Sequence, residues 1–278
     1  MLKELQTIFH SITKSLEILY VIEGIKPCAR ILVFEDKLTD TVKFLESKEI
    51  FCDVSGFKVL KQNQQSEFYS DKSIKAGKND SRKGHFFLYA SKKKDIAEEA
   101  KIAEEKSDHI RLGKILGYPE CCCKFFARNF NEKNTDLTLD ALENSDGFEF
   151  SFYNNICTRH FDVSLLSHFP HSFGCKPSLE IARKNFEILR GNSREISDFF
   201  EKILASMVIY SISEGITIVR KHEEKNGFIL YSDVVSTSRS KLYYLISSNS
   251  QLRIIDKNSF NVGDIDVSGR DYGVMIFN

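Results

Sequence analysis

The chain has 278 residues, 42% of them hydrophobic, which is enough to bury one large core or two smaller ones without disulfides. Lysine plus arginine equals aspartate plus glutamate, 39 of each, so the net charge gives no reason to expect a nucleic acid or an anionic membrane as partner. No apolar run approaches the roughly 18 residues of a membrane span, and acid and amide side chains interrupt the apolar pattern of the first residues, which disfavours a secretory signal. We therefore expect a cytoplasmic protein without a membrane partner, where clustered cysteines bind metal or do chemistry more often than they form disulfides.

The first third of the chain is predicted to form a small layer of helices and strands. Apolar residues at helical spacing predict helices at 2–20, 39–48 and 95–116. Short apolar or alternating runs predict strands at 29–34, 52–60 and 85–90. Ser55-Gly56 shifts the alternation as a bulge would, and the polar residues 61–83 are expected to form a long exposed loop. This part has no glycine-rich nucleotide-binding motif, so no nucleotide fold is inferred.

The middle third is predicted to be mainly helical and the last third rich in strands. Helices are expected at 119–130, 177–190 and 195–212. Strands are expected at 216–219, 228–233, 242–247, 252–256, 265–267 and 274–277. The charged stretch 220–227 interrupts the run of short apolar segments, and we expect the boundary between the helical centre and the β-rich region here. The inferred fold class is α+β, with a small N-terminal α/β layer at 1–116, a helical centre carrying a Cys/His site at 117–222 and a β-rich C-terminal region at 223–278.

Three adjacent cysteines, Cys121, Cys122 and Cys123, follow the turn Gly117-Tyr118-Pro119. Proline suits the first position of a helix, because that position needs no N–H and its φ is already helical. The cysteines then fall in the first helical turn, where unpaired N–H groups and the helix dipole favour negative charge. A thiolate is the form of cysteine that binds metals and attacks electrophiles. The motif therefore predicts ligating or reactive sulfur at a helix start.

A second stretch places His168, His171 and Cys175 within eight residues, just before Pro177. Pro177 is expected to open another helix, so Cys175 also precedes a helix start. Two proline-braced segments with Cys or His at a helix start look like the halves of one site.

Three interpretations of these halves remain open. In the first, Cys121, Cys122, His168, His171 and Cys175 supply ligands for zinc or iron, including an iron–sulfur cluster. Adjacent helical residues point about 100° apart, so the three neighbouring cysteines cannot all face one ion. In the second, Cys121 or Cys122 is the thiol of an enzyme or redox protein, with a histidine as base. In the third, the cysteines are small buried hydrophobes, as is expected of Cys28, Cys52 and Cys157.

The number of protein ligands at the site would distinguish a catalytic metal from a structural one. Three protein ligands and a water would suit a metalloenzyme acting on a small-molecule or macromolecular substrate, with Asp108 and His109 as candidate acid and base. Four protein ligands would suit a structural metal in a module that binds RNA or another protein. A contiguous basic surface would favour RNA as the partner of such a module. The residues that could form this surface are Lys72, Lys75, Lys78, Arg82 and Lys83.

Two motifs also resemble an uncharacterised, mainly archaeal family, domain-of-unknown-function family 483. Its pattern is Gly-Tyr-Pro-x-Cys-Cys followed by His-x-Pro-Cys-Ser-x-x-Cys, matched here by residues 117–122 and 168–175. The resemblance covers roughly residues 95–190 and implies that Cys121, Cys122, His168 and Cys175 share a site. His171 stands where the family has a cysteine. Histidine can replace cysteine as a metal ligand but cannot act as a resolving thiol, so the departure favours metal binding. The family supplies no established reaction.

Overall fold

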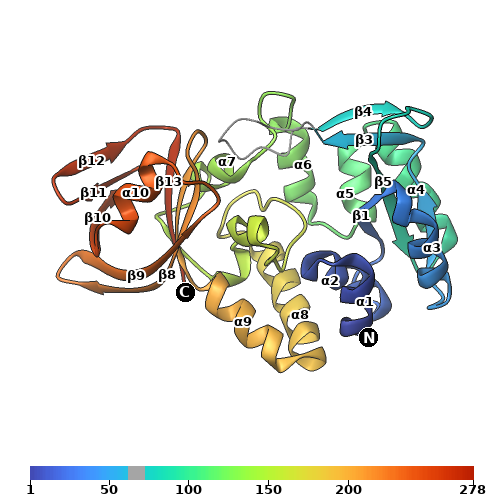
Figure 1. Ribbon diagram of the computed structural model, residues 1–278, viewed down its shortest axis with the longest axis horizontal. Helices are drawn as coiled ribbons and strands as arrows, with labels where there is room; N and C mark the ends of the chain where they lie inside the picture. Colours follow the sequence, from blue (N-terminus) through green and yellow to red (C-terminus); the bar gives the residue numbers. More distant parts are fainter. Residues whose placement is uncertain (62–72) are drawn as a thin grey trace. The chain divides into compact units, whose positions relative to one another are not determined.

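The computed structural model describes residues 1–61 and 73–278 (Figure 1). These residues form two compact units. The N-terminal unit contains the described residues of 1–135 together with 184–194, and the C-terminal unit contains 136–183 and 195–278. Within the described chain, no helix combines the length and the apolar character that crossing a bilayer requires.

The N-terminal unit is built on an antiparallel sheet. Its strands are β1 (Ala29–Phe34), β2 (Phe51–Val54), β3 (Phe57–Lys61), β4 (Ser73–Gly77) and β5 (His85–Ser91). They run in the order β1-β5-β3-β4, and β2 also pairs with β5. The helices are α1 (Leu2–Phe9), α2 (Ile12–Ile22), α3 (Leu38–Glu46), α4 (Lys94–Glu105), α5 (His109–Ile115) and α6 (Glu120–Asn129). A core cluster joins α4 and α5 to the sheet; its buried members are Cys28, Tyr89, Ala100, Ala103, Leu112 and Leu116.

Two helices that the sequence predicts as single are each broken by a left-handed residue. The expected helix 2–20 stops at His10, whose φ is 48°, and Ser11 then caps α2 by accepting a hydrogen bond from Lys14 N. The expected helix 95–116 breaks at Ser107, whose φ is 55°, and α5 begins just after it. The apolar spacing continues across both breaks, so periodicity alone does not reveal them.

The expected strand 52–60 is two strands. Both pair antiparallel with β5, and the register shifts by two residues between Val54↔Leu88 and Val59↔His85, as the bulge expected at Ser55-Gly56 requires. The Ser55 hydroxyl donates to Phe57 O and accepts from Phe87 N. Residues 73–77, expected as loop, form β4 and pair with β3 along its length. Residues 62–72 of the expected loop lie outside the described residues, and residues 78–83 lie between β4 and β5.

The C-terminal unit contains an eight-stranded sheet in the order β12-β11-β10-β9-β8-β7-β13-β6. The strands are β6 (Glu149–Phe150), β7 (Met207–Ser211), β8 (Gly215–Lys225), β9 (Phe228–Ser236), β10 (Gln251–Asp256), β11 (Ser259–Val262), β12 (Ile265–Ser268) and β13 (Tyr272–Phe277). Only the β13–β6 pair is parallel among these described strands. Its helices are α7 (Thr138–Glu143), α9 (Arg194–Leu204, from residue 195) and α10 (Lys241–Ser247), with short 3-10 turns η2 (Phe152–Asn154) and η3 (Cys157–Phe161). Helix α8 (Lys176–Asn192) begins in this unit, and its residues from 184 on belong to the N-terminal unit.

Three expectations for this region are corrected. Residues 242–247 form helix α10 and not a strand, because Ser240 caps it through Tyr243 N and a short apolar run fits either structure. The expected helix 195–212 ends at Leu204, and the five buried residues 207–211 form β7. The charged stretch 220–227 does not interrupt the sheet: it is the outer half of β8 and a turn at Asn226-Gly227, where φ is 55° and 77°. Two successive positive φ values are typical of a tight hairpin turn.

The predicted α+β fold class is confirmed. An antiparallel sheet with helices comes first, central helices carry the cysteines, and the eight-stranded sheet comes last. Helix α6 matches the expected helix 119–130 to within a residue at each end, and α8 matches 177–190 to within two.

Candidate metal centre

The turn before the three cysteines is shaped by Gly117 and Pro119. Gly117 has φ of 80°, and a Cβ at this position would lie 2.8 Å from Pro27 Cδ. Pro119 caps α6 instead of opening it, with ψ of 139°, and its carbonyl accepts hydrogen bonds from Cys122 N at 3.0 Å and Cys123 N at 2.9 Å. The helix therefore begins one residue later than expected, and all three cysteines still lie in its first turns.

The three neighbouring cysteines point in different directions. The sulfur atoms of Cys121 and Cys122 lie 3.9 Å apart. The Cys123 thiol instead approaches Tyr118 O at 3.7 Å and packs on α5, where a Cβ at Gly113 would be only 2.5 Å from its sulfur. Burial raises the pKa of Cys123. Cys123 is thus a packed thiol on the α5 side of the helix.

The segment that carries His171 and Cys175 is held by three side chains of its own unit. Asn144 donates to His171 O at 3.1 Å. Ser145 Oγ accepts from Phe173 N at 2.8 Å, and the fully buried Asn154 donates to Phe173 O at 2.8 Å. Both backbone polar groups of Phe173 are therefore satisfied, as a buried loop requires.

The Phe173 ring anchors the same segment. It is 1% exposed and lies 5.1 Å from the Phe150 ring and 5.4 Å from the Phe277 ring, measured between centroids. Cys175 N donates to Ser172 O at 3.0 Å, and Cys175 O accepts from Leu179 N in the first turn of α8. Cys175 therefore sits immediately before α8, where the sequence places it.

The structure brings four candidate ligands together. One ligand atom from each of Cys121, Cys122, His171 and Cys175 lies within 4.8 Å of all the others. Cys122 and Cys175 are buried, and Cys121 and His171 are half-buried. In a tetrahedral zinc site with bonds of about 2.0–2.3 Å, ligand atoms lie about 3.3–3.8 Å apart. The group is thus within small side-chain adjustments of enclosing a metal ion.

His168 is not a member of this group, although the sequence offers it equally with His171. Its Nε2 lies 2.9 Å from the hydroxyl of the buried Ser178, on α8. The two histidines are three residues apart in irregular backbone, where spacing does not determine which side chain faces a given point. The identity of the histidine is therefore information that only the structure supplies.

Asp108 and His109 are also outside the group. Asp108 caps α5 by accepting from Arg111 N at 3.0 Å, and the His109 ring stands edge-on to the rings of Phe126 and Phe130 at 5.4 and 5.9 Å. Aspartate is among the residues that most often cap a helix start in this way.

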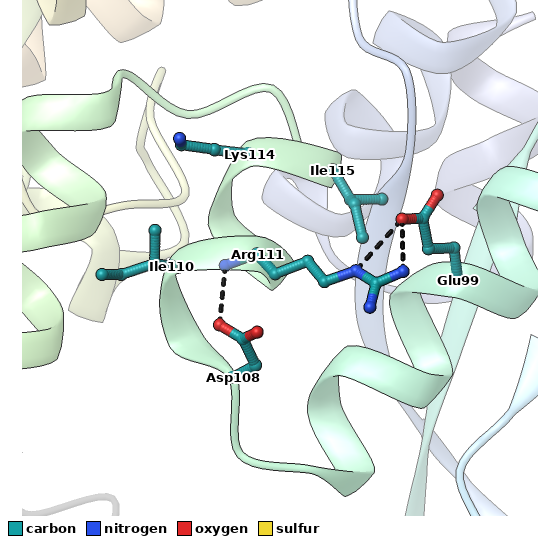
Figure 2. A pocket seen from close by; sticks show the side chains of 6 residues that line it. All are labelled: Glu99, Asp108, Ile110, Arg111, Lys114 and Ile115. Atoms are coloured by element: carbon teal, nitrogen blue, oxygen red, sulfur yellow. Dashed lines mark hydrogen bonds and ion pairs between the residues drawn. The ribbon is translucent and has the colours of Figure 1, made fainter.

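A hollow of about 530 Å³ lies beside Asp108 (Figure 2). Figure 2 shows that the charged groups around it are paired with one another. The Arg111 guanidinium donates to Glu99 Oε1 at 2.7 and 3.1 Å, and Asp108 accepts a hydrogen bond from Arg111 N. Lys114, also on the rim, lies 3.4 Å from Glu120. These pairings leave the hollow without an evident acid–base role.

Of the remaining cysteines, Cys28 and Cys157 are fully buried and Cys52 is half-buried on β2. Burial raises the pKa of the Cys28, Cys52 and Cys157 thiols to about 12. A thiol with such a pKa is protonated at neutral pH and is a poor nucleophile or metal ligand. Their placement agrees with the structural role expected from the sequence.

Two of the basic residues considered for RNA, Lys75 and Arg82, have acidic partners. Arg82 binds Asp80 at 2.9 and 2.7 Å, and Lys75 lies 3.8 Å from Glu104 while covering the Phe57 ring. Lys72 lies outside the described residues. RNA binding stays a prediction.

Sequence reasoning missed the residues that hold the second half of the group. Asn144, Ser145 and Asn154 lie about 20–30 residues before the segment they bind, and no local pattern marks them. A second missed contact is the Arg159 guanidinium, which binds Asp136 at 2.7 Å and covers the Phe169 ring at 4.9 Å.

Neither family models, nor curated proteins, nor solved structures give a significant match to the chain. The resemblance of the Gly117–Cys122 motif to a family therefore stays a prediction. What the geometry itself establishes is a Cys₃His group that can hold a metal ion.

Proposed function

We propose that this is a zinc protein in which Cys121, Cys122, His171 and Cys175 bind one Zn²⁺. The observation that carries the proposal is the convergence of these four ligand atoms to within 4.8 Å. Metal-ligand side chains from separate segments meet in one place, and the backbone of each segment is independently fixed. A preorganised donor set of this kind binds a metal more tightly than flexible ligands do, since less ordering entropy is lost.

The donor types favour zinc over other metals. Three sulfurs and one imidazole form one of the usual tetrahedral sets of structural zinc. Hard ions such as Mg²⁺ and Ca²⁺ prefer oxygen ligands, and iron–sulfur clusters are most often held by four cysteines. Three thiolates and Zn²⁺ carry a net charge of −1. Cys121 and Cys122 lie in the first turn of α6 and Cys175 precedes α8, so both helix dipoles favour that charge.

The four ligands favour a structural metal. A catalytic zinc keeps one position for water or substrate, whereas four protein ligands complete the tetrahedron. In the described residues, no carboxylate joins the group, and the two proposed acid–base residues serve α5 capping and aromatic packing. The metal would then stabilise the fold by closing the long segment from Cys121 to Cys175.

The test is elemental analysis of protein purified without a histidine tag under reducing, anaerobic conditions. We expect close to one zinc per chain, lost in Cys122→Ser and Cys175→Ser. His171→Ala and His168→Ala form a matched pair of histidine variants, and only His171→Ala should lose zinc. Cys123→Ser is the matched cysteine control and should keep it.

Cobalt substitution gives an independent readout of the same ligands. Thiolate-to-cobalt charge transfer in the near ultraviolet should fall stepwise as each of the three ligating cysteines is replaced. Intense visible bands would report tetrahedral coordination. Zinc-free protein, or zinc that His171→Ala retains and His168→Ala loses, would refute the proposed ligand set.

A further inference from the structure

The reactive sulfur of this chain is concentrated in the metal group. Of seven cysteines, three belong to it. Of the other four, Cys123 lies against Gly113, Cys28 and Cys157 are fully buried, and Cys52 is half-buried on β2. Desolvation raises the pKa of Cys28, Cys52 and Cys157 to about 12, so these thiols stay protonated at neutral pH. Oxidation should therefore be selective for the group, because oxidants attack accessible thiolates.

The three cysteines of the group differ in access. Cys121 is half-buried, whereas Cys122 and Cys175 are buried at 2% exposure each. A small oxidant from solvent therefore meets the Cys121 sulfur first. A second sulfur is already within 4.8 Å of it.

We infer that the metal group is also a peroxide-reactive modification site, in which Cys121 and Cys175 form a disulfide and the metal is released. This inference rests on the proposed metal site. The oxidant class is hydrogen peroxide, and the disulfide is the modification.

The chemistry proceeds in two balanced steps. The Cys121 thiolate attacks one peroxide oxygen, the O–O bond breaks, and Cys121 sulfenic acid and hydroxide form. The Cys175 thiolate then attacks the Cys121 sulfur, the S–O bond breaks, and a disulfide and a second hydroxide form. Two thiolates together lose two electrons, and peroxide gains them. Cys122 and His171 remain as only two ligands, too few to hold the ion.

Cys175 is the resolving partner and Cys122 is not, although Cys122 is closer in sequence. Cys121 and Cys122 are adjacent on α6, and adjacent helical side chains diverge by about 100°. Their sulfurs are 3.9 Å apart, while a disulfide needs about 2.05 Å. Closing that gap between neighbours would distort the peptide bond between them. Cys175 lies on a separate segment, before α8, so its bond to Cys121 would strain no peptide bond shared by the two residues.

The experiment treats zinc-loaded protein with hydrogen peroxide and follows zinc release with a chromogenic chelator. Disulfides are then mapped by tryptic mass spectrometry. Trypsin leaves the three adjacent cysteines on residues 115–124 and Cys175 alone on 160–183, since Lys176-Pro177 resists cleavage. We expect the two peptides to become linked as about one zinc per chain is released. Dithiothreitol should reverse both changes.

Fragmentation of the linked pair should place the bond at Cys121. Cys121→Ser should lose the linked peptide, and Cys123→Ser should keep both it and the zinc release. A link through Cys122 or Cys123, or zinc release with only sulfinic acid and no link, would overturn the inference. Zinc content before peroxide tests the metal proposal separately: if zinc is absent but Cys121 and Cys175 still link, the metal proposal fails and the thiol pairing stands.

Discussion

Replacing Gly117 by alanine tests how the turn before the cysteines is built. The substitution is unfavourable for two reasons. The backbone φ at this position is 80°, which L residues rarely adopt, and the added Cβ would lie 2.8 Å from Pro27 Cδ. Gly24 offers a matched control in the same unit, because its φ is 75° and nothing lies within 4 Å of the added Cβ. The two variants share the backbone strain and differ in the clash.

The strain and the clash contribute separate costs. A left-handed backbone costs a non-glycine residue about 1–2 kcal/mol. Alanine also restricts the unfolded chain, which offsets about 0.4–1 kcal/mol of that cost. Gly24→Ala should therefore lose about 1 kcal/mol. Gly117→Ala adds an overpacking cost of about 1–3 kcal/mol, because proline is rigid and cannot rotate away. We expect a total loss of about 2–4 kcal/mol.

The assay is urea denaturation of both variants in zinc-containing buffer, followed by chelator competition for zinc. Gly117→Ala should have the lower midpoint and the weaker zinc binding, since Gly117 leads into Pro119 and the ligating cysteines. Equal midpoints for the two variants would show that Pro27 does not confine the turn, and would refute the reasoning.

Three further predictions concern polar groups away from the turn. Asn154→Ala leaves Phe173 O buried without its donor and should lower stability by about 1–3 kcal/mol and weaken zinc binding, both measurable in the same titrations. Burial alone would raise the pKa of Asp136, but Arg159 and the hydrogen bonds that Asp136 accepts lower it well below its usual range. The stabilisation is therefore present above the unfolded-state pKa of about 3.9 and is lost as pH falls toward the folded value, so Asp136→Asn should flatten the acid side of the stability profile. The buried Lys58 Nζ binds a carboxylate and two backbone carbonyls, and Lys58→Met should lower stability by about 1–3 kcal/mol in thermal unfolding; an unchanged midpoint would mean that these acceptors find other donors.

The sequence alone determined the local features of the site. A proline two residues from a cysteine predicted the helix starts at α6 and α8, because proline geometry and helix-end donors act within a few residues. It also predicted that three neighbouring cysteines could not all face one ion, and Cys123 does turn toward Gly113. The α+β class followed from apolar spacing, which reports burial on one face of an element.

The sequence was least informative where a single residue or a short run decides the structure. His10 and Ser107 break helices whose apolar spacing continues across the break, and residues 242–247 form a helix that the apolar run could equally have placed in a strand. Backbone conformation at such points depends on one dihedral angle and on capping bonds, which leave little trace in hydrophobic periodicity.

Only the tertiary structure decided which histidine joins the cysteines. His168 and His171 share one irregular segment, and their directions are set by contacts with Asn144, Ser178 and the buried Phe173 ring. Asn144 and Ser178 come from other elements of the chain, and the Phe173 ring packs against Phe150 and Phe277, so no spacing within the segment encodes these contacts. Helix starts are local and can be read from neighbouring residues, whereas the direction of a loop side chain is fixed by long-range packing that exists only once the chain has folded.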